Sequence, residues 1–268
     1  MHGDSHVDLN DTEKLLLLEY ILRVKDASKL HGLPLLPVGN KPFTSFKPRC
    51  HNELYYVANE KEHTFIDKNF MGKIVDNTIG KELLTTLHNY ATNEEDINIQ
   101  ILSDAEFAKI LNENIMYYKV ENSENLQEIK IERKKMQWIY KIWDHLQQTN
   151  RDLSWFLDVY LLLIDTNENN NFIILRKLGA KQKCLCRSSQ KHLPLFVDIV
   201  QILSLLGSTF ISVNFENILK YEKLKSYVIE IDNVTAVLSS FEVHSSFPSN
   251  LVQTNLTHHQ RNILTSYL

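Results

Sequence analysis

The segment of residues 32–43, which reads G-L-P-L-L-P-V-G-N-K-P-F, restricts the fold more than any other part of this chain. Its three prolines lack a backbone N–H and restrict the residue before each of them, which excludes a helix. Edge strands accept proline, and a Gly-Asn pair is typical of a turn. We therefore predict a β-hairpin in this segment.

The residues on either side of this hairpin predict further helix and strand. Asn10 and Glu13 can cap one another reciprocally, and leucines follow at helical spacing, so a helix is expected over residues 11–24. Residues 53–58 carry a cluster of β-prone side chains, which we expect to add a third strand to the hairpin.

The middle of the chain continues this mixture. Apolar residues over 83–90 recur at helical spacing, and an alternating strand is expected over 97–101. Ser103 and Glu106 then fit a capping box, with Leu102 placed to pack on Phe107, so a third helix is predicted to begin there.

The second part of the chain repeats the order of the first. Apolar residues over 136–146 predict a helix, and the apolar run 158–164 overlays 32–38 at an offset of 126 residues. This order of elements predicts a weak internal duplication. Residues 119–127 are polar without an apolar period, and we predict them as the boundary between a first half, 1–118, and a second half, 128–268, which can also pack as one unit. The predicted fold class is α+β, with helices packed on short antiparallel hairpins and sheets.

The charge balance argues against nucleic acid as a partner. The formal net charge is −4 and the pI is near 6.3, so the chain lacks the positive field that sequence-independent binding of nucleic acid requires. Residues 130–141 do mix lysines with aromatic side chains, as single-strand binders do. However, Met136, Ile139 and Trp143 explain that pattern as the core stripe of a helix with lysines on its outer face.

The composition also favours a reducing compartment. Residues 1–14 are polar, and the apolar runs are far shorter than the roughly 20 residues needed to cross a bilayer, so we expect neither secretion nor a membrane partner. Cys50, Cys184 and Cys186 are an odd number of cysteines in a chain too large to need disulfides. Reduced thiols and a cytoplasmic location are therefore predicted.

Cysteine and histidine residues do not have the spacing of a complete metal site. Cys184, Cys186 and His192 could hold zinc in part, but a structural zinc site needs four ligands and the sequence has no second close pair. His258 and His259 are adjacent in a predicted terminal helix and do not face the same way. No metal ligand is predicted.

Acidic residues and glycines give no catalytic or cofactor-binding pattern either. Glu94, Glu95 and Asp96 are consecutive carboxylates, which are typical of solvent-facing charge. Gly72 and Gly80 are isolated and lack the lysine that ends a phosphate-binding loop. We predict no catalytic residue and no cofactor.

The most specific signal is a likeness to a known repeat. A leucine-rich helix is followed by Leu30-His31-Gly32-Leu33-Pro34-Leu35-Leu36-Pro37-Val38 and then by Phe43 and Phe46. This order resembles the helix and "GLPLLPL…G.F..F" segment of the large repeats of sacsin. Residues 96–102 before Phe107 resemble the next strand and helix of the same repeat. The apolar run 159–164 departs from the family pattern because it has no proline.

The resemblance implies a chaperone-linked protein whose repeats carry an ATPase segment related to the heat-shock protein 90 nucleotide fold. The nucleotide motifs of that segment are missing here, so no catalytic residue is carried over. We expect a non-catalytic module that binds chaperone machinery, proteasome components or unfolded clients, either alone or as part of a longer protein. Two alternatives stay open: an enzyme whose site assembles from distant residues such as Cys50, Cys184 and the histidines, and a purely structural spacer.

Overall fold

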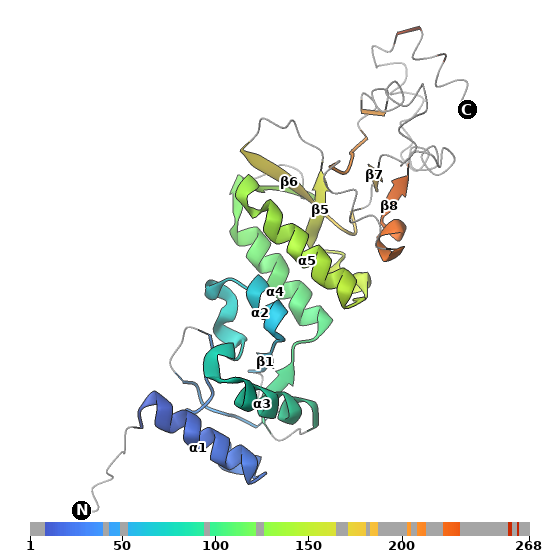
Figure 1. The fold of residues 1–268 in the computed structure, drawn as a ribbon. Coiled ribbons are helices and arrows are strands. Elements are labelled where there is room, and N and C mark those ends of the chain that lie inside the picture. The colour runs from blue at the N-terminus through green and yellow to red at the C-terminus, as the bar shows by residue number, and fades with distance from the viewer. Residues whose placement is uncertain are drawn as a thin grey trace, which may run out of the picture. The chain divides into compact units, whose positions relative to one another are not determined.

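A computed structural model of the chain describes residues 9–39, 43–48, 53–93, 97–121, 126–164, 171–180, 183–186, 203–204, 208–212 and 222–230, with Thr257, His258 and Asn262. The chain divides into two compact units, Met1–Asn114 and Ile115–Leu268. Figure 1 shows the helices and strands along the chain. Helices occur together with an antiparallel sheet, so the predicted α+β class is confirmed.

The first unit consists of short helices around a small number of extended segments. In chain order its elements are α1 (Asp11–Arg23), η1 (Ala27–Leu30), β1 (Tyr55–Val57), α2 (Glu60–Phe65), η2 (Lys68–Lys73), η3 (Asn77–Ile79), α3 (Lys81–Asn93), β2 (Ile99–Ile101) and α4 (Asp104–Tyr117), whose last turn lies in the second unit. The predicted reciprocal cap of α1 is confirmed, because the Asn10 side chain accepts from the N–H of Glu13 and the Glu13 carboxylate accepts from the N–H of Asn10.

The proline-rich segment forms a hairpin contact. Leu36 and Thr44 exchange two backbone hydrogen bonds of 2.8 and 3.0 Å in antiparallel geometry, as predicted. Phe46 also exchanges backbone hydrogen bonds with Gly32 and Leu33. The predicted Gly-Asn turn lies partly outside the described residues.

The strand expected as the third strand of this hairpin has a different partner. β1 pairs in parallel with β2, so that prediction was wrong. Parallel neighbours need a crossover connection, and the helical stretch from α2 to α3 supplies it. All three residues of β1 are buried, which suits a strand covered on both faces.

Backbone hydrogen bonds connect the hairpin and the β1–β2 pair into a closed ring of short extended segments. Three further backbone links complete it: Val38 with Val75, Ile74 with Tyr56, and Asn98 with Lys47. Apolar side chains from these segments pack with those of α1 and α3. The most deeply buried residues of this core include Leu18, Leu22, Leu30, Leu36, Phe46, Leu87, Ile97 and Ile99. The first unit therefore has a core of its own.

The second unit is built on a sheet. Its elements are β3 (Lys119–Glu121), β4 (Glu128–Glu132), η4 (Arg133–Lys135), α5 (Met136–Gln148), η5 (Leu153–Phe156), β5 (Tyr160–Ile164), β6 (Phe172–Lys177), β7 (Cys184–Cys186), η7 (Glu222–Ser226) and β8 (Val228–Glu230). Four antiparallel strands have the order β3-β4-β6-β5, and β7 pairs in parallel with β8. Ile211 pairs with Ile164 and Phe210 with Leu185, so residues 210–211 connect the four-stranded sheet to the β7–β8 pair through isolated β-bridges.

Helix α5 lies against the sheet (Figure 1). The indole N–H of Trp143 in this helix donates to the carbonyl of Leu161 in β5 at 2.9 Å. Residues 119–127, predicted as a polar boundary, contain β3. The boundary between the two compact units falls between Asn114 and Ile115, within the sequence of α4. The division of the chain into two halves, 1–118 and 128–268, stays a prediction. The predicted terminal helix that contains His258 and His259 lies almost wholly outside the described residues.

The two units share a local series of conformations. α1 and α5 are each followed by a residue of positive φ, Lys25 and Asn150, and then by an Asp-x-Ser sequence that begins a 3-10 turn, η1 or η5. Buried extended residues follow both turns, at 35–38 and in β5. Asp26 and Asp152 are 126 residues apart, which is the offset found in the sequence. The internal duplication itself stays a prediction.

Candidate functional site

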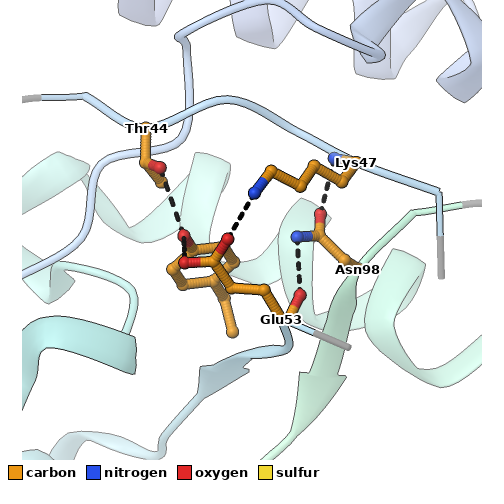
Figure 2. Close-up of polar contacts among 5 residues, drawn as sticks. Thr44, Lys47, Glu53 and Asn98 are labelled. Atoms are coloured by element: carbon orange, nitrogen blue, oxygen red, sulfur yellow. Dashed lines mark hydrogen bonds and ion pairs between the residues drawn. The ribbon is translucent and has the colours of Figure 1, made fainter. Parts of the chain in front are cut away.

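A polar cluster ties together the extended segments of the first unit (Figure 2). Asn98 is fully buried, and its side chain accepts from the N–H of Lys47 at 2.9 Å and donates to the carbonyl of Glu53 at 2.9 Å. The Lys47 ammonium pairs with the Glu53 carboxylate. The Glu53 carboxylate also accepts from the hydroxyl of Tyr55 at 2.9 Å. The same Tyr55 hydroxyl lies 3.2 Å from Thr44 Oγ1.

The ionisation of this cluster does not suit nucleophilic or base chemistry. The hydrogen bond that Lys47 donates to the Glu53 carboxylate raises the pKa of Lys47, which keeps its ammonium protonated. Desolvation raises the pKa of the Tyr55 phenol, which keeps it neutral. A protonated lysine and a neutral phenol are not activated at neutral pH. The arrangement instead suits a structural role, in which these polar contacts hold the hairpin against the β1–β2 pair.

The cysteines singled out in the sequence are either buried or outside the described residues. Cys184 and Cys186 are buried in β7, and burial raises the pKa of the Cys184 thiol to about 11. Such a thiol carries little thiolate at neutral pH and reacts slowly. Cys50 and His192 lie outside the described residues. Within the described part of the chain, no group of three or more His, Cys, Asp or Glu side chains is arranged to hold a metal ion.

The remaining sequence candidates are placed as follows. His258 Nδ1 lies 3.2 Å from the amide nitrogen of Asn262, while His259 and residues 94–96 lie outside the described residues. Gly72 lies within η2, and Gly80 follows η3 with a φ of +98°.

A buried arginine in the sheet of the second unit was missed from the sequence. Arg176 of β6 is 4% exposed, and its guanidinium donates to Glu128 at 3.1 Å and to Thr209 Oγ1 at 2.7 Å. It also lowers the pKa of the neighbouring Cys184, against the stronger effect of burial. Nothing in a strand reading F-I-I-L-R-K distinguishes a buried arginine from a solvated one.

The basic and aromatic residues over 130–141 do not form a single helical face. Lys130 lies in β4 and Lys135 in η4, so the prediction that all the lysines form the outer face of one helix was wrong. The alternating sequence E-I-K-I-E of β4 is a strand with Ile129 and Ile131 buried.

Exposed apolar side chains form a second feature that sequence analysis missed. α1 buries Leu18, Ile21 and Leu22, yet its residues Leu16 and Tyr20 are exposed, as is Val24 at its C-cap. These three residues are spaced by four and therefore form a stripe along the helix. We call them the α1 stripe. The run L-L-L-L in the sequence contained this signal, because four consecutive leucines cannot all face one core.

Comparisons with known proteins give no relative for this chain: no family model, curated protein or solved structure matches it. Among the described residues, no helix combines the length and apolar character that a membrane span needs.

Proposed function

We propose that this chain is a non-catalytic protein-interaction module of a sacsin-like chaperone or co-chaperone, acting in the cytoplasm in protein folding and quality control. The observation that carries the proposal is the α1 stripe, in which Leu16 and Tyr20 are 60% and 66% exposed. Single exposed apolar residues are common, but an aligned group of them is typical of a binding surface. The likeness of residues 16–46 to a sacsin repeat supports the same function.

The packing of the first unit explains how such a stripe can persist. α1 is held from its opposite face by Leu18 and Leu22 in the core, and the Tyr90 hydroxyl donates to the carbonyl of Leu22 at 2.9 Å. The helix is therefore anchored without the stripe. An amphipathic or unfolded client can contact Leu16, Tyr20 and Val24 without displacing any core side chain.

The proposal is tested by suppression of thermal aggregation of a model client, at several ratios of chain to client, with and without ATP. We expect suppression that does not depend on ATP and that is reduced when Leu16 and Tyr20 are both replaced by serine. Leu126→Ser is the matched control, because Leu126 is 82% exposed but is not part of the stripe. Equal suppression by both variants would contradict the role of the stripe.

The two alternatives predict other outcomes of the same experiment. A purely structural spacer gives no suppression at any ratio, whereas ATP-dependent suppression indicates a nucleotide site that the motifs do not show. An enzyme built around Cys50, Cys184 and the histidines requires an activated thiol. Alkylation that is fast at neutral pH would favour that enzyme, and uniformly slow alkylation would count against it.

A further inference from the structure

A second exposed apolar surface lies where α4 ends and β3 begins. Met116, Tyr117 and Val120 are exposed there, with Tyr117 at 58%. Tyr118 follows Tyr117, and their rings meet edge to face with centroids 5.4 Å apart. Tyr118 also meets the ring of Trp138 edge to face at 5.8 Å. We call this group the Tyr117 surface.

Positive charge gathers beside the Tyr117 surface. The Lys135 ammonium lies 3.4 Å from the centroid of Tyr118 and 5.9 Å from that of Trp138. Lys134 and Lys141 are exposed, and they lie four and three residues from Trp138 along η4 and α5. The Lys134 ammonium also pairs with the Glu132 carboxylate. Residues 127–141 carry five basic and two acidic side chains, a net charge of +3 in a chain whose net charge is −4.

Aromatic side chains and neighbouring cations suit protein recognition. Tyrosine and tryptophan dominate the energetics of protein interfaces, and complementary charge around them speeds association and excludes wrong partners. A cationic rim therefore favours an acidic partner. The apolar centre requires that this partner also carry at least one large apolar side chain.

The ring geometry favours a peptide over nucleic acid. Bases bind such surfaces by stacking on a free aromatic face. The Tyr118 ring, at the centre of the group, has the Lys135 ammonium over one face and edge contacts with Tyr117 and Trp138. A base cannot stack on the covered face, whereas an aliphatic or aromatic peptide side chain can pack against the exposed Tyr117 ring.

We propose that the Tyr117 surface binds an acidic protein segment that carries a large apolar anchor residue. This inference rests on the proposed function as an interaction module and names the chemistry of one class of partner. It adds a site in the second unit to the α1 stripe of the first.

The binding experiment uses the whole chain and three fluorescein-labelled probes, followed by fluorescence anisotropy. The probes are a peptide rich in Glu and Leu, a matched peptide in which each Glu is replaced by Lys, and an oligo(dT) strand. We expect the acidic peptide to bind at least about tenfold more tightly than the basic one. Its affinity should fall about tenfold or more between roughly 50 and 500 mM NaCl, because salt screens the lysine rim.

Two variants locate the site. Tyr117→Ala removes the exposed ring and Lys141→Glu reverses a rim charge, and each should weaken binding of the acidic peptide about fivefold or more. Trp155→Ala is the control, since Trp155 is an aromatic residue of the same unit, 56% exposed, outside this surface. It should change the affinity less than about twofold, and far-UV circular dichroism of all three variants should match the unchanged chain.

Other outcomes overturn the inference in distinguishable ways. Equal binding of acidic and basic peptides, tighter binding of oligo(dT), or an equal effect of Trp155→Ala would each contradict the assigned surface. If the acidic peptide does not bind while the chain still suppresses client aggregation, this inference fails and the proposed function stands. If both activities are absent, both proposals fail.

Discussion

Asn98 forms side-chain hydrogen bonds with the backbone of Glu53 and Lys47, which precede it in the sequence by 45 and 51 residues. Its buried amide accepts from the N–H of Lys47 and donates to the carbonyl of Glu53, and both of these residues lie outside the regular strands. Replacement by alanine leaves both backbone groups without this partner. We expect Asn98→Ala to lower the free energy of unfolding by about 2–4 kcal/mol in a urea titration.

The control for Asn98 is Asn69→Ala. The Asn69 side chain donates to Asp67 at 2.9 Å, but that hydrogen bond is local and exposed. The same substitution there should cost less than about 0.5 kcal/mol. Similar losses for the two variants would show that the burial of Asn98 does not decide its contribution.

Gly39 and Gly32 both have positive φ, at +46° and +79°, but only Gly39 is in a crowded place. A Cβ on Gly39 would lie 2.7 Å from the Cβ of Met71 and closer still to its carbonyl oxygen, whereas a Cβ on Gly32 would meet nothing within 4 Å. Gly32→Ala should cost about 1 kcal/mol of backbone strain. Gly39→Ala should cost about 3 kcal/mol or more, because backbone must also move. Urea unfolding of the two variants checks this order.

Cys184 makes stability depend on pH in the alkaline range. Its pKa is about 11 in the fold against an ordinary 9.0, so the folded state keeps a proton that the unfolded state releases. This contribution is complete below pH 9 and is lost as the pH rises from 9 to 11. We expect the unfolding free energy of the unchanged chain to fall on the order of 2 kcal/mol further than that of Cys184→Ala across this range. Parallel curves for the two proteins would contradict the prediction.

At the scale of elements, β6 holds two neighbouring ion pairs of equal length but different burial. Arg176 and Glu128 lie 3.1 Å apart with side chains 5% and 22% exposed, while Lys177 and Asp158 lie 3.1 Å apart with Asp158 90% exposed. Removing one member of a buried ion pair leaves the other charge buried without its partner, which is costly, whereas solvated ion pairs contribute little to stability. Arg176→Ala should cost about 3 kcal/mol and Lys177→Ala under about 1 kcal/mol by urea unfolding. Equal costs would show that Glu128 is solvated well enough to stand alone.

The helices were the most predictable elements because their signals are local. The caps at Asn10 and Ser103 and the apolar spacing after them place the starts of α1 and α4. β1 was found from its composition, but its parallel partner depends on a crossover that no short stretch of sequence encodes. β3 was missed because Lys119 and Glu121 leave this short strand a single apolar residue. β4 was missed although its sequence E-I-K-I-E alternates, because Lys130 was assigned with the neighbouring lysines to the outer face of one helix.

The candidate surfaces were less predictable than the fold. Whether Tyr20 or Leu18 faces solvent depends on which side of α1 the rest of the core covers, and this is a tertiary property. The same holds for Arg176, whose burial depends on Thr209 and Glu128 arriving from other strands. Side-chain type alone cannot distinguish these roles.

At the scale of the whole molecule, each unit has its own core and its own hydrogen-bonded strands, which favours independent unfolding. The chain offers a direct way to follow one unit, because Trp138, Trp143 and Trp155, its three tryptophans, all lie in Ile115–Leu268. Tryptophan fluorescence therefore reports the second unit, while far-UV circular dichroism reports both.

We expect Asn98→Ala to lower the urea midpoint seen by circular dichroism but to leave the fluorescence midpoint unchanged, since Asn98 lies in the first unit. Arg176→Ala should lower the fluorescence midpoint, because it acts on the sheet that carries α5. If Asn98→Ala moves both midpoints together, the two units unfold as one cooperative domain. In that case the predicted halves 1–118 and 128–268 are not separable domains, and α4, which crosses from one unit to the other, couples their stabilities.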